Sequence, residues 1–135
     1  MQLAVTGLYA GLLAIFALVL SFRAGSYRGK AKASILYGEP IDWELAERVR
    51  VHQNFVESVP MILILMGVIE VGGGSTGFLH TAGIMLVVSR VAHAVGLKHD
   101  NMGHPGRAIG AGGTALITLV SAGYALWLAA GILFG

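Results

Sequence analysis

Four long apolar stretches, separated by short polar segments, dominate the chain. The first covers residues 3–22, where no side chain is charged. At ~1.5 Å per residue, a helix of that length crosses the ~30 Å hydrocarbon core of a bilayer. Three further stretches cover about residues 45–71, 78–97 and 107–134. The pattern predicts an all-α integral membrane protein in which residues 1–135 form a single bundle of four transmembrane helices.

The composition supports a membrane environment. Of 135 residues, 56% are hydrophobic and 12% are charged, about half the ~25% typical of soluble proteins. So little polar surface cannot cover a soluble globule. The chain has no cysteine, so a disulfide, a thiolate metal site and a cysteine nucleophile are excluded. Any thiol must come from a ligand.

The basic residues indicate the orientation of the bundle. Eight of the nine lie in the first and third connections, which the positive-inside rule places in the cytoplasm. They are Arg23, Arg28, Lys30, Lys32, Arg48, Arg50, Lys98 and Arg107. We therefore expect both termini to lie outside the cytoplasm. Because the charges gather at helix ends, the net charge of +2 does not predict nucleic-acid binding.

Two connections contain residues typical of turns and helix starts. In the first, Gly38, Glu39 and Pro40 interrupt regular structure, and Asp42 is placed to cap a helix that begins before it enters the bilayer. The Gly-rich segment 72–77 would cradle a phosphate only if a strand preceded it. It joins two apolar helices instead, which favours a tight turn.

Four ionisable residues in the second and third apolar stretches need an explanation: Glu57, Glu70, Arg90 and His93. Such residues are costly in lipid, usually face the bundle interior and often mark functional sites. Glu70 lies beside the Gly-rich turn, so solvation at the outer interface explains it. Glu57, Arg90 and His93 lie deeper and need another explanation.

An antiparallel hairpin folded about the Gly-rich turn predicts partners for these deeper residues. Residues at equal depth in such a hairpin have numbers that add to about 147. Glu57 is then level with Arg90, and Asn54 is level with His93. One interpretation is a structural ion pair beside interhelical hydrogen bonds.

A second interpretation is a ligand pocket open to the cytoplasm. Arg50, Asn54 and Glu57 have i, i+4, i+7 spacing and share one helix face. A structural pair needs only two charges, whereas arginines are in excess near the pocket mouth. Forked guanidinium donors hold carboxylates well, so this excess favours an anionic ligand.

These residues carry a resemblance to a known family. Residues 50–57, Arg-Val-His-Gln-Asn-Phe-Val-Glu, followed by Pro60, resemble the second-helix signature of the membrane-associated proteins in eicosanoid and glutathione metabolism, the MAPEG family. Residues 90–93, Arg-Val-Ala-His, resemble its third-helix motif, and residues 105–107, Pro-Gly-Arg, the start of its fourth helix. Length, number of spans and motif order also match over nearly the whole chain.

The resemblance implies a fold, a ligand and a location. Members of the family form homotrimers of four-helix subunits and bind glutathione between adjacent subunits on the cytoplasmic side. They include glutathione transferases, peroxidases and eicosanoid synthases. A bacterial member is expected in the inner membrane, with the lipid bilayer, glutathione and a lipophilic small molecule as its partners.

Site residues follow from the resemblance position by position. The glutathione-binding positions match Arg50, Asn54, Glu57, Arg90 and His93, and Arg23 or Arg28 matches a further arginine after the first helix. Glu57 is suited to the amino group of the ligand. Arg107 matches the arginine that stabilises the thiolate and is the catalytic candidate.

Two positions depart from the family pattern. Leu97 stands where the eicosanoid branch has a tyrosine after the third-helix histidine, and Ala111 lies near the position of another tyrosine in the fourth helix. Two hydroxyl groups are therefore missing. The resemblance supports glutathione binding better than it supports any particular reaction.

The leading hypothesis is a glutathione-binding membrane enzyme, a transferase and/or peroxidase that acts on lipophilic electrophiles or hydroperoxides. Glutathione would be the co-substrate. The alternative is a small membrane transporter or a non-catalytic scaffold. His99, Asp100 and His104 in the third connection lack the rigid spacing of a metal site, so we expect a solvated loop and no metal.

Overall fold

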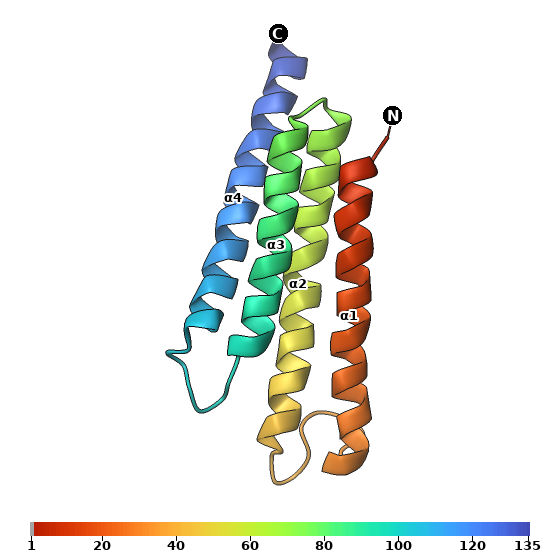
Figure 1. The fold of residues 1–135 in the computed structure, drawn as a ribbon, viewed down its shortest axis with the longest axis vertical. Coiled ribbons are helices and arrows are strands. Elements are labelled where there is room, and N and C mark those ends of the chain that lie inside the picture. Colours follow the sequence, from red (N-terminus) through yellow and green to blue (C-terminus); the bar gives the residue numbers. More distant parts are fainter. Residues whose placement is uncertain (1) are drawn as a thin grey trace.

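A computed structural model describes residues 2–135, which form a bundle of four antiparallel α-helices (Figure 1). The helices are α1 (Ala4–Ala31), α2 (Trp43–Val71), α3 (Thr76–Gly96) and α4 (Pro105–Phe134). Each is long and apolar enough to cross a membrane. Both termini lie at the same end of the bundle. Within the described residues the all-α fold with four potential membrane spans is as the sequence predicts.

Helices α1 and α2 extend further at the basic end than the bilayer requires. Helix α1 has 28 residues, about 42 Å at ~1.5 Å per residue, and continues nine residues beyond the expected end at Phe22. No proline occurs between Arg23 and Ala31, and the helix continues through Gly25 and Gly29. Helix α2 begins at Trp43, and the Asp42 side chain accepts a hydrogen bond from the Leu45 N–H at 2.9 Å. The predicted N-cap is therefore confirmed.

The Gly-rich segment between α2 and α3 forms a tight turn, which confirms that prediction. Gly73 has a positive φ of 77°, a backbone conformation that favours glycine. A Cβ atom on Gly74 would lie 2.3 Å from the Cγ2 atom of Ile69, so this position has no room for a side chain. The Ser75 hydroxyl then accepts a hydrogen bond from the Phe78 N–H and caps α3.

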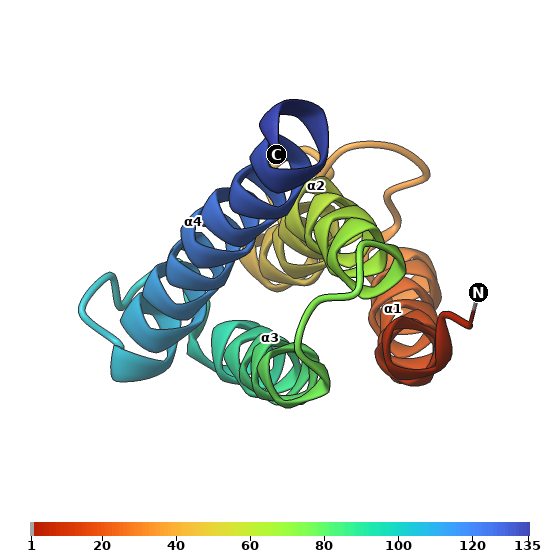
Figure 2. The ribbon, with the colours of Figure 1, turned by 90° about the horizontal axis from the view of Figure 1, so that it is seen from above.

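The helices pack around a common apolar core. Helix α1 packs on α2 and α3, and α4 packs on α3 and α2, whereas within residues 2–135 helices α1 and α4 do not touch (Figure 2). Core side chains without solvent exposure include Leu45, Ile62, Met66, Ile69 and Leu86. Large apolar side chains are exposed along the outer faces of all the helices. This outward apolar surface is what a bundle in lipid requires.

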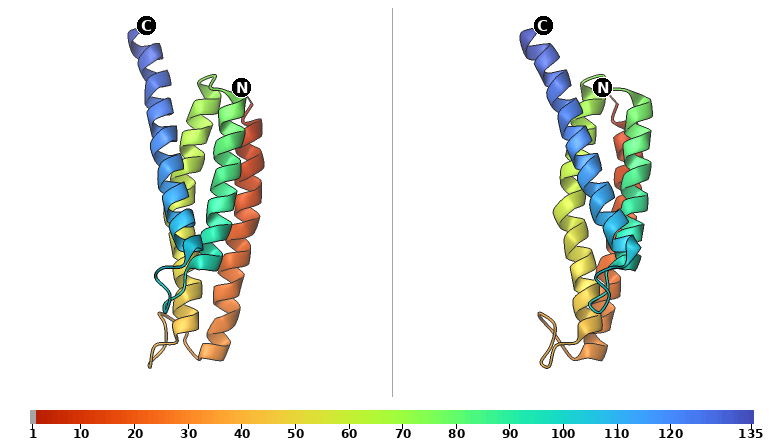
Figure 3. Two further views of the ribbon diagram at one scale, coloured as in Figure 1. Left: turned by 60° about the vertical axis from the view of Figure 1, so that its left-hand side comes forward. Right: turned by 90° about the vertical axis from the view of Figure 1, so that its left-hand side faces the viewer.

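The contact between α3 and α4 depends on small residues. A Cβ atom on Gly96 would lie 2.3 Å from the Arg107 backbone nitrogen, and one on Gly110 would lie 2.4 Å from the His93 Cβ. Close backbone approach of this kind is typical of glycine pairs in membrane helices. It fixes the start of α4, including Arg107, against the end of α3. Helix α4 then runs past the turn between α2 and α3 at the outer end (Figure 3).

Glu70 at the outer end has a structural partner that the sequence did not reveal. Its carboxylate accepts hydrogen bonds from the Val5 N–H at 2.9 Å and the Thr6 N–H at 2.8 Å. These are free backbone donors in the first turn of α1, where a negative charge is also favoured by the helix dipole. Glu70 remains partly exposed at the outer end, but solvation alone does not explain it, because α1 begins beside the end of α2.

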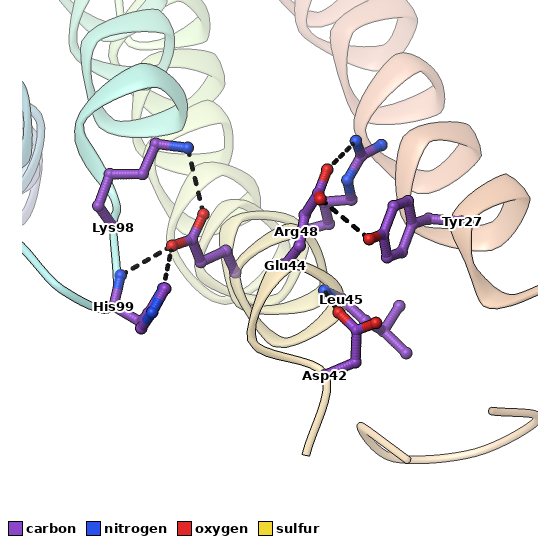
Figure 4. Close-up of polar contacts among 8 residues, drawn as sticks. Tyr27, Asp42, Glu44, Leu45, Arg48, Lys98 and His99 are labelled. Carbon is purple, nitrogen blue, oxygen red and sulfur yellow. Dashed lines mark hydrogen bonds and ion pairs between the residues drawn. The ribbon is translucent and has the colours of Figure 1, made fainter. Parts of the chain in front are cut away.

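Polar contacts at the basic end link α2 to α1 and to the connection after α3 (Figure 4). The Glu44 carboxylate accepts hydrogen bonds from the Tyr27 hydroxyl at 2.9 Å and from Arg48 at 2.6 Å. The Glu47 carboxylate lies 3.2 Å from the Lys98 Nζ atom and accepts a hydrogen bond from the His99 N–H at 2.9 Å. The first group joins α2 to α1, and the second joins α2 to the connection after α3.

Candidate functional site

A buried guanidinium group lies between helices α2, α3 and α4. Arg90 on α3 is only 3% exposed. Its Nη1 atom donates to the Asn54 Oδ1 atom at 2.8 Å and the Ser58 Oγ atom at 3.1 Å. Its Nη2 atom donates to the Gly110 carbonyl oxygen at 2.8 Å and to the Thr114 hydroxyl. The Nε atom is buried without a partner.

The charge of Arg90 is not neutralised by a carboxylate. Its four acceptors are neutral, and within residues 2–135 no ion pair involves this residue. Burying an unpaired charge is unfavourable, and four dipoles offset only part of the lost hydration. An anion that reached Arg90 would therefore gain a strong electrostatic interaction.

The predicted pair between Glu57 and Arg90 is wrong, although the predicted depth is close. Arg90 is level with Asn54 and Ser58, which flank Glu57 along α2. Asn54 and Ser58 are four residues apart and face α3, whereas the Glu57 side chain projects from another face of the helix. Among residues 2–135 no hydrogen bond joins Asn54 to His93, and the Asn54 amide oxygen accepts from Arg90 instead.

Glu57 pairs instead with Arg50 on the outward face of α2. The Arg50 Nη1 atom lies 3.4 Å from the Glu57 Oε1 atom, and the two side chains are 53% and 59% exposed. His52, Gln53 and Val56 lie beside Glu57 in a shallow depression. The expected single face of Arg50, Asn54 and Glu57 is thus divided, with Asn54 turned inward and the ion pair turned outward.

His93 lies among the other candidate residues. It is 6% exposed and packs against the backbone of Gly110. Its imidazole is within electrostatic range of three guanidinium groups, those of Arg90, Arg107 and Arg50. The fold therefore brings these four sequence-predicted residues into one region at the basic half of the bundle, although they come from three different helices.

An open groove runs along α2 and α4 with Arg90 at its base. Its lining residues are Asn54, Ser58, Arg90, Ala111, Thr114, Ala115, Thr118, Leu119 and Ala122. Ser58 and Thr114 contact Arg90 directly but were not singled out from the sequence. The signal that would have found them is one helical turn, since Ser58 follows Asn54 by four residues and Thr114 follows Gly110 by four.

Comparison with known proteins decides the family. The family model of MAPEG matches residues 6–127, which is most of the chain. The chain belongs to the MAPEG family. It is 34% identical over 95 residues to the inner membrane protein YecN of Escherichia coli K12, with 70% of this chain and 71% of YecN covered. YecN of E. coli O6:H1 strain CFT073 matches equally well. No solved structure matches with significance.

Family membership and the helices together define the location. This MAPEG chain is a multi-pass inner membrane protein. Its polar cluster of Asn54, Arg90, His93 and Arg107 lies in the half of the bundle that carries the basic connections. Because the positive-inside rule places these connections in the cytoplasm, a ligand would approach the cluster from that side.

Arg23 and Arg28 of this MAPEG protein do not join the cluster within a single copy. Both lie on α1, which does not touch α4 within the described part of the chain. The Arg28 Nη1 atom donates to the carbonyl oxygens of Ala33 at 3.4 Å and Leu36 at 3.2 Å, so it secures the connection after α1. Arg23 lines a separate cavity between α1, α2 and α3.

Glu47 of α2 forms a group of metal-ligating atoms with two residues of the third connection, but the Glu47 carboxylate is already engaged. Glu47, His99 and Asp100 place one such atom each within 4.8 Å of one another. The Glu47 Oε1 atom lies 2.6 Å from the His99 Nδ1 atom, and the other oxygen faces Lys98. His104 is elsewhere, where its Nδ1 atom accepts from the Gly106 N–H and caps α4. The group differs from the His99, Asp100 and His104 set considered from the sequence.

Proposed function

We propose that this MAPEG protein is a glutathione-dependent membrane enzyme that conjugates or reduces lipophilic electrophiles or hydroperoxides. The observation that carries the proposal is the buried guanidinium of Arg90, which lacks a carboxylate partner and lies at the base of an open groove. Glutathione carries two carboxylates and an amino group. The family includes transferases and peroxidases that use this thiol.

The residues around Arg90 divide the recognition of glutathione among them. Arg90 and Arg50 attract the carboxylates, because guanidinium donors bind carboxylates in a forked geometry. Asn54 presents its amide beside Arg90. Glu57 supplies a negative charge for the amino group of the ligand. His93 lies among the guanidinium groups and completes the polar wall.

Arg107 stabilises the thiolate in this proposal. It is the second residue after Pro105 at the start of α4, so its guanidinium adds to the positive end of the helix dipole. A nearby positive charge lowers the pKa of a thiol and increases the fraction of reactive thiolate. The lipophilic substrate reaches the thiolate from the bilayer along the groove, where Ala115, Leu119 and Ala122 provide an apolar surface.

A homotrimer explains the outward face of α2. Arg50 and Glu57 are more than half exposed at a depth where charged side chains facing lipid are costly. A second copy that covered this face would remove the charges from lipid and enclose glutathione. Because the chain has no cysteine, Gln53→Cys gives a single cross-linking site on this face. Intersubunit cross-links are expected from Gln53→Cys but not from Val88→Cys on the apolar face of α3.

The test of the proposed function is binding followed by turnover. Glutathione should raise the melting temperature of the detergent-solubilised protein, because a ligand that binds the folded state stabilises it by mass action. Purified protein is then assayed with a panel of electrophiles and hydroperoxides, using glutathione and other thiols as donors. The absence of a shift at millimolar glutathione would overturn the proposal.

The rival function is a small proton-coupled exporter. Such a protein needs a membrane-embedded carboxylate that is free to titrate. Glu57 is the candidate, but its carboxylate is already paired with the Arg50 guanidinium at 3.4 Å. The contact with Arg50 therefore favours the glutathione site over the exporter.

A further inference from the structure

A second cavity lies between α1, α2 and α3, away from the groove that contains Arg90. Its rim at the basic end carries Arg23, Glu44, Glu47, Arg48 and Lys98. The rim residues of α2 lie on the face toward α1 and α3, whereas Arg50 and Glu57 project outward from the same helix. The cavity and the glutathione site are therefore separate features of one subunit.

The charges of the rim leave one cation in excess. Glu44 accepts from Arg48 at 2.6 Å, and Glu47 lies 3.2 Å from Lys98, so each carboxylate has its own basic partner. The Arg23 guanidinium has no hydrogen-bond or ion-pair partner among residues 2–135. The rim thus offers a free forked donor with a net charge of one positive unit, which suits an anion.

The inner wall of the cavity is apolar. It consists of Leu20 on α1, Val51 on α2, Ala94 on α3, and Leu97 directly after α3. Along α2 the lining extends from Glu44 to Val51, a rise of about 10 Å at ~1.5 Å per residue. Leu97 occupies a family tyrosine position, and its side chain makes this end of the wall apolar.

A charged mouth above an apolar wall selects amphiphiles. An inorganic anion would leave the partly exposed side chains of Ala94 and Leu97 in contact with water, and a neutral lipophile would leave Arg23 unpaired. Apolar pockets with a few convergent polar groups are the usual form of small-molecule sites. Only a molecule with an anionic head and a short apolar tail satisfies both parts.

We propose that this cavity binds a small amphiphilic anion, a carboxylate or phosphate on a short apolar chain. The Arg23 guanidinium holds the anionic head at the rim. The tail lies against Leu20, Val51, Ala94 and Leu97. This site does not depend on glutathione binding at Arg90, so either site can exist without the other.

Hexanoate is the probe that tests the proposal. Binding is measured by titration calorimetry on the full chain in nanodiscs of neutral lipid, with empty nanodiscs subtracted. We expect saturable binding of one hexanoate per chain. Acetate, which lacks the tail, and hexylamine, which reverses the charge of the head, should each bind at least about tenfold more weakly, equivalent to ~1.4 kcal/mol.

Variants identify the residues that bind the anionic head and the apolar tail of hexanoate. Arg23→Gln should weaken hexanoate binding about tenfold, and Ala94→Leu should weaken hexanoate by filling the cavity without affecting acetate. Arg50→Gln is the matched control, because it removes the same charge from the outward face of α2. It should impair glutathione binding and leave hexanoate binding unchanged. Melting temperatures of the variants establish that each is folded.

The outcomes distinguish the cavity from the glutathione site, and a lipid headgroup from a soluble anion as the source of the ligand. Absence of saturable hexanoate binding, or equal losses in Arg23→Gln and Arg50→Gln, would overturn the proposal whatever glutathione does. In nanodiscs containing phosphatidylglycerol, weaker apparent hexanoate binding would identify a lipid headgroup as a competing source of the same chemistry. Unchanged hexanoate binding there would identify a soluble anion as the occupant.

Discussion

Glu57 and Glu70 lie on the same helix, but their surroundings differ in kind. Glu70 accepts two backbone hydrogen bonds at the start of α1. Glu57 is 59% exposed and has one contact, at 3.4 Å, with an arginine that is itself exposed. A carboxylate whose lone pairs are already used by the backbone holds the fold together. One with unused acceptors is available to a ligand or another subunit.

The same contrast holds for the basic residues. Arg28 donates to two loop carbonyls, and its role is accounted for by the fold. Arg90 also has neutral partners, but it is buried, retains an unpartnered Nε atom and borders an open groove. A cation satisfied by loop carbonyls therefore indicates structure, and a buried cation without an anion indicates a site.

The largest expected effect on stability is that of Glu70→Ala. It leaves two backbone N–H groups of α1 without their charged acceptor, and hydrogen bonds to charged groups contribute roughly 1.5–3 kcal/mol each. We expect a loss of about 2–3 kcal/mol in the free energy of unfolding. Thermal unfolding in detergent measures it. Glutathione should still stabilise the variant.

Two further variants serve as controls for the stability effect of Glu70→Ala. Glu70→Gln retains one acceptor oxygen and should lose less stability than Glu70→Ala. If Glu57→Ala costs as much stability as Glu70→Ala, the division between a structural and an available carboxylate is wrong.

Glu57→Gln should weaken glutathione binding and leave stability almost unchanged, the opposite of Glu70→Ala. Exposed ion pairs contribute about 0–1 kcal/mol, so the free energy of unfolding should change little. Loss of the charged contact with the amino group of glutathione should weaken binding by about tenfold, or ~1.4 kcal/mol. Calorimetric titration with glutathione measures the effect. Unchanged affinity would remove Glu57 from the glutathione site.

The sequence was sufficient for the helices and their order, because twenty-residue apolar runs have few alternatives in a bilayer. It also identified the Asp42 cap and the Gly-rich turn, which depend on local chemistry. The nine extra residues of α1 were missed, because that part of the helix leaves the apolar run. Its Tyr27 hydroxyl bonds to Glu44 on α2, a contact between segments distant in sequence.

The depth of the site residues along the bundle was predictable from the sequence, but the direction in which their side chains point was not. The hairpin register placed Arg90 within a helical turn of Asn54 and Ser58, as observed. It could not tell which face of α2 turns toward α3, since a difference of one residue rotates a side chain by about 100° around the helix. Arg90 therefore meets Asn54 rather than Glu57. Thr114 was missed because the packing of α4 against α3 depends on contacts at Gly110.

Arg107→Ala should affect chemistry more than binding. Removing the positive charge at the start of α4 should raise the pKa of bound glutathione by about one unit, which corresponds to ~1.4 kcal/mol. Turnover at neutral pH then falls, and a higher pH partly restores it because more thiolate forms. Thiolate absorbance of the bound complex, titrated in both proteins, measures the shift. Coincident titration curves would leave Arg107 with a role in topology alone.

The smallest expected effect is that of Arg50→Lys. Lysine keeps the positive charge but replaces a forked donor with a single ammonium group. Stability should not change measurably, since the side chain is 53% exposed and its ion pair is long. Glutathione affinity should fall by about threefold, well under the ~1.4 kcal/mol of a tenfold change. Arg50→Gln, which removes the charge, is the matched control and should lose more. Equal losses for Arg50→Lys and Arg50→Gln would mean that the forked geometry, rather than the charge, is what Arg50 contributes.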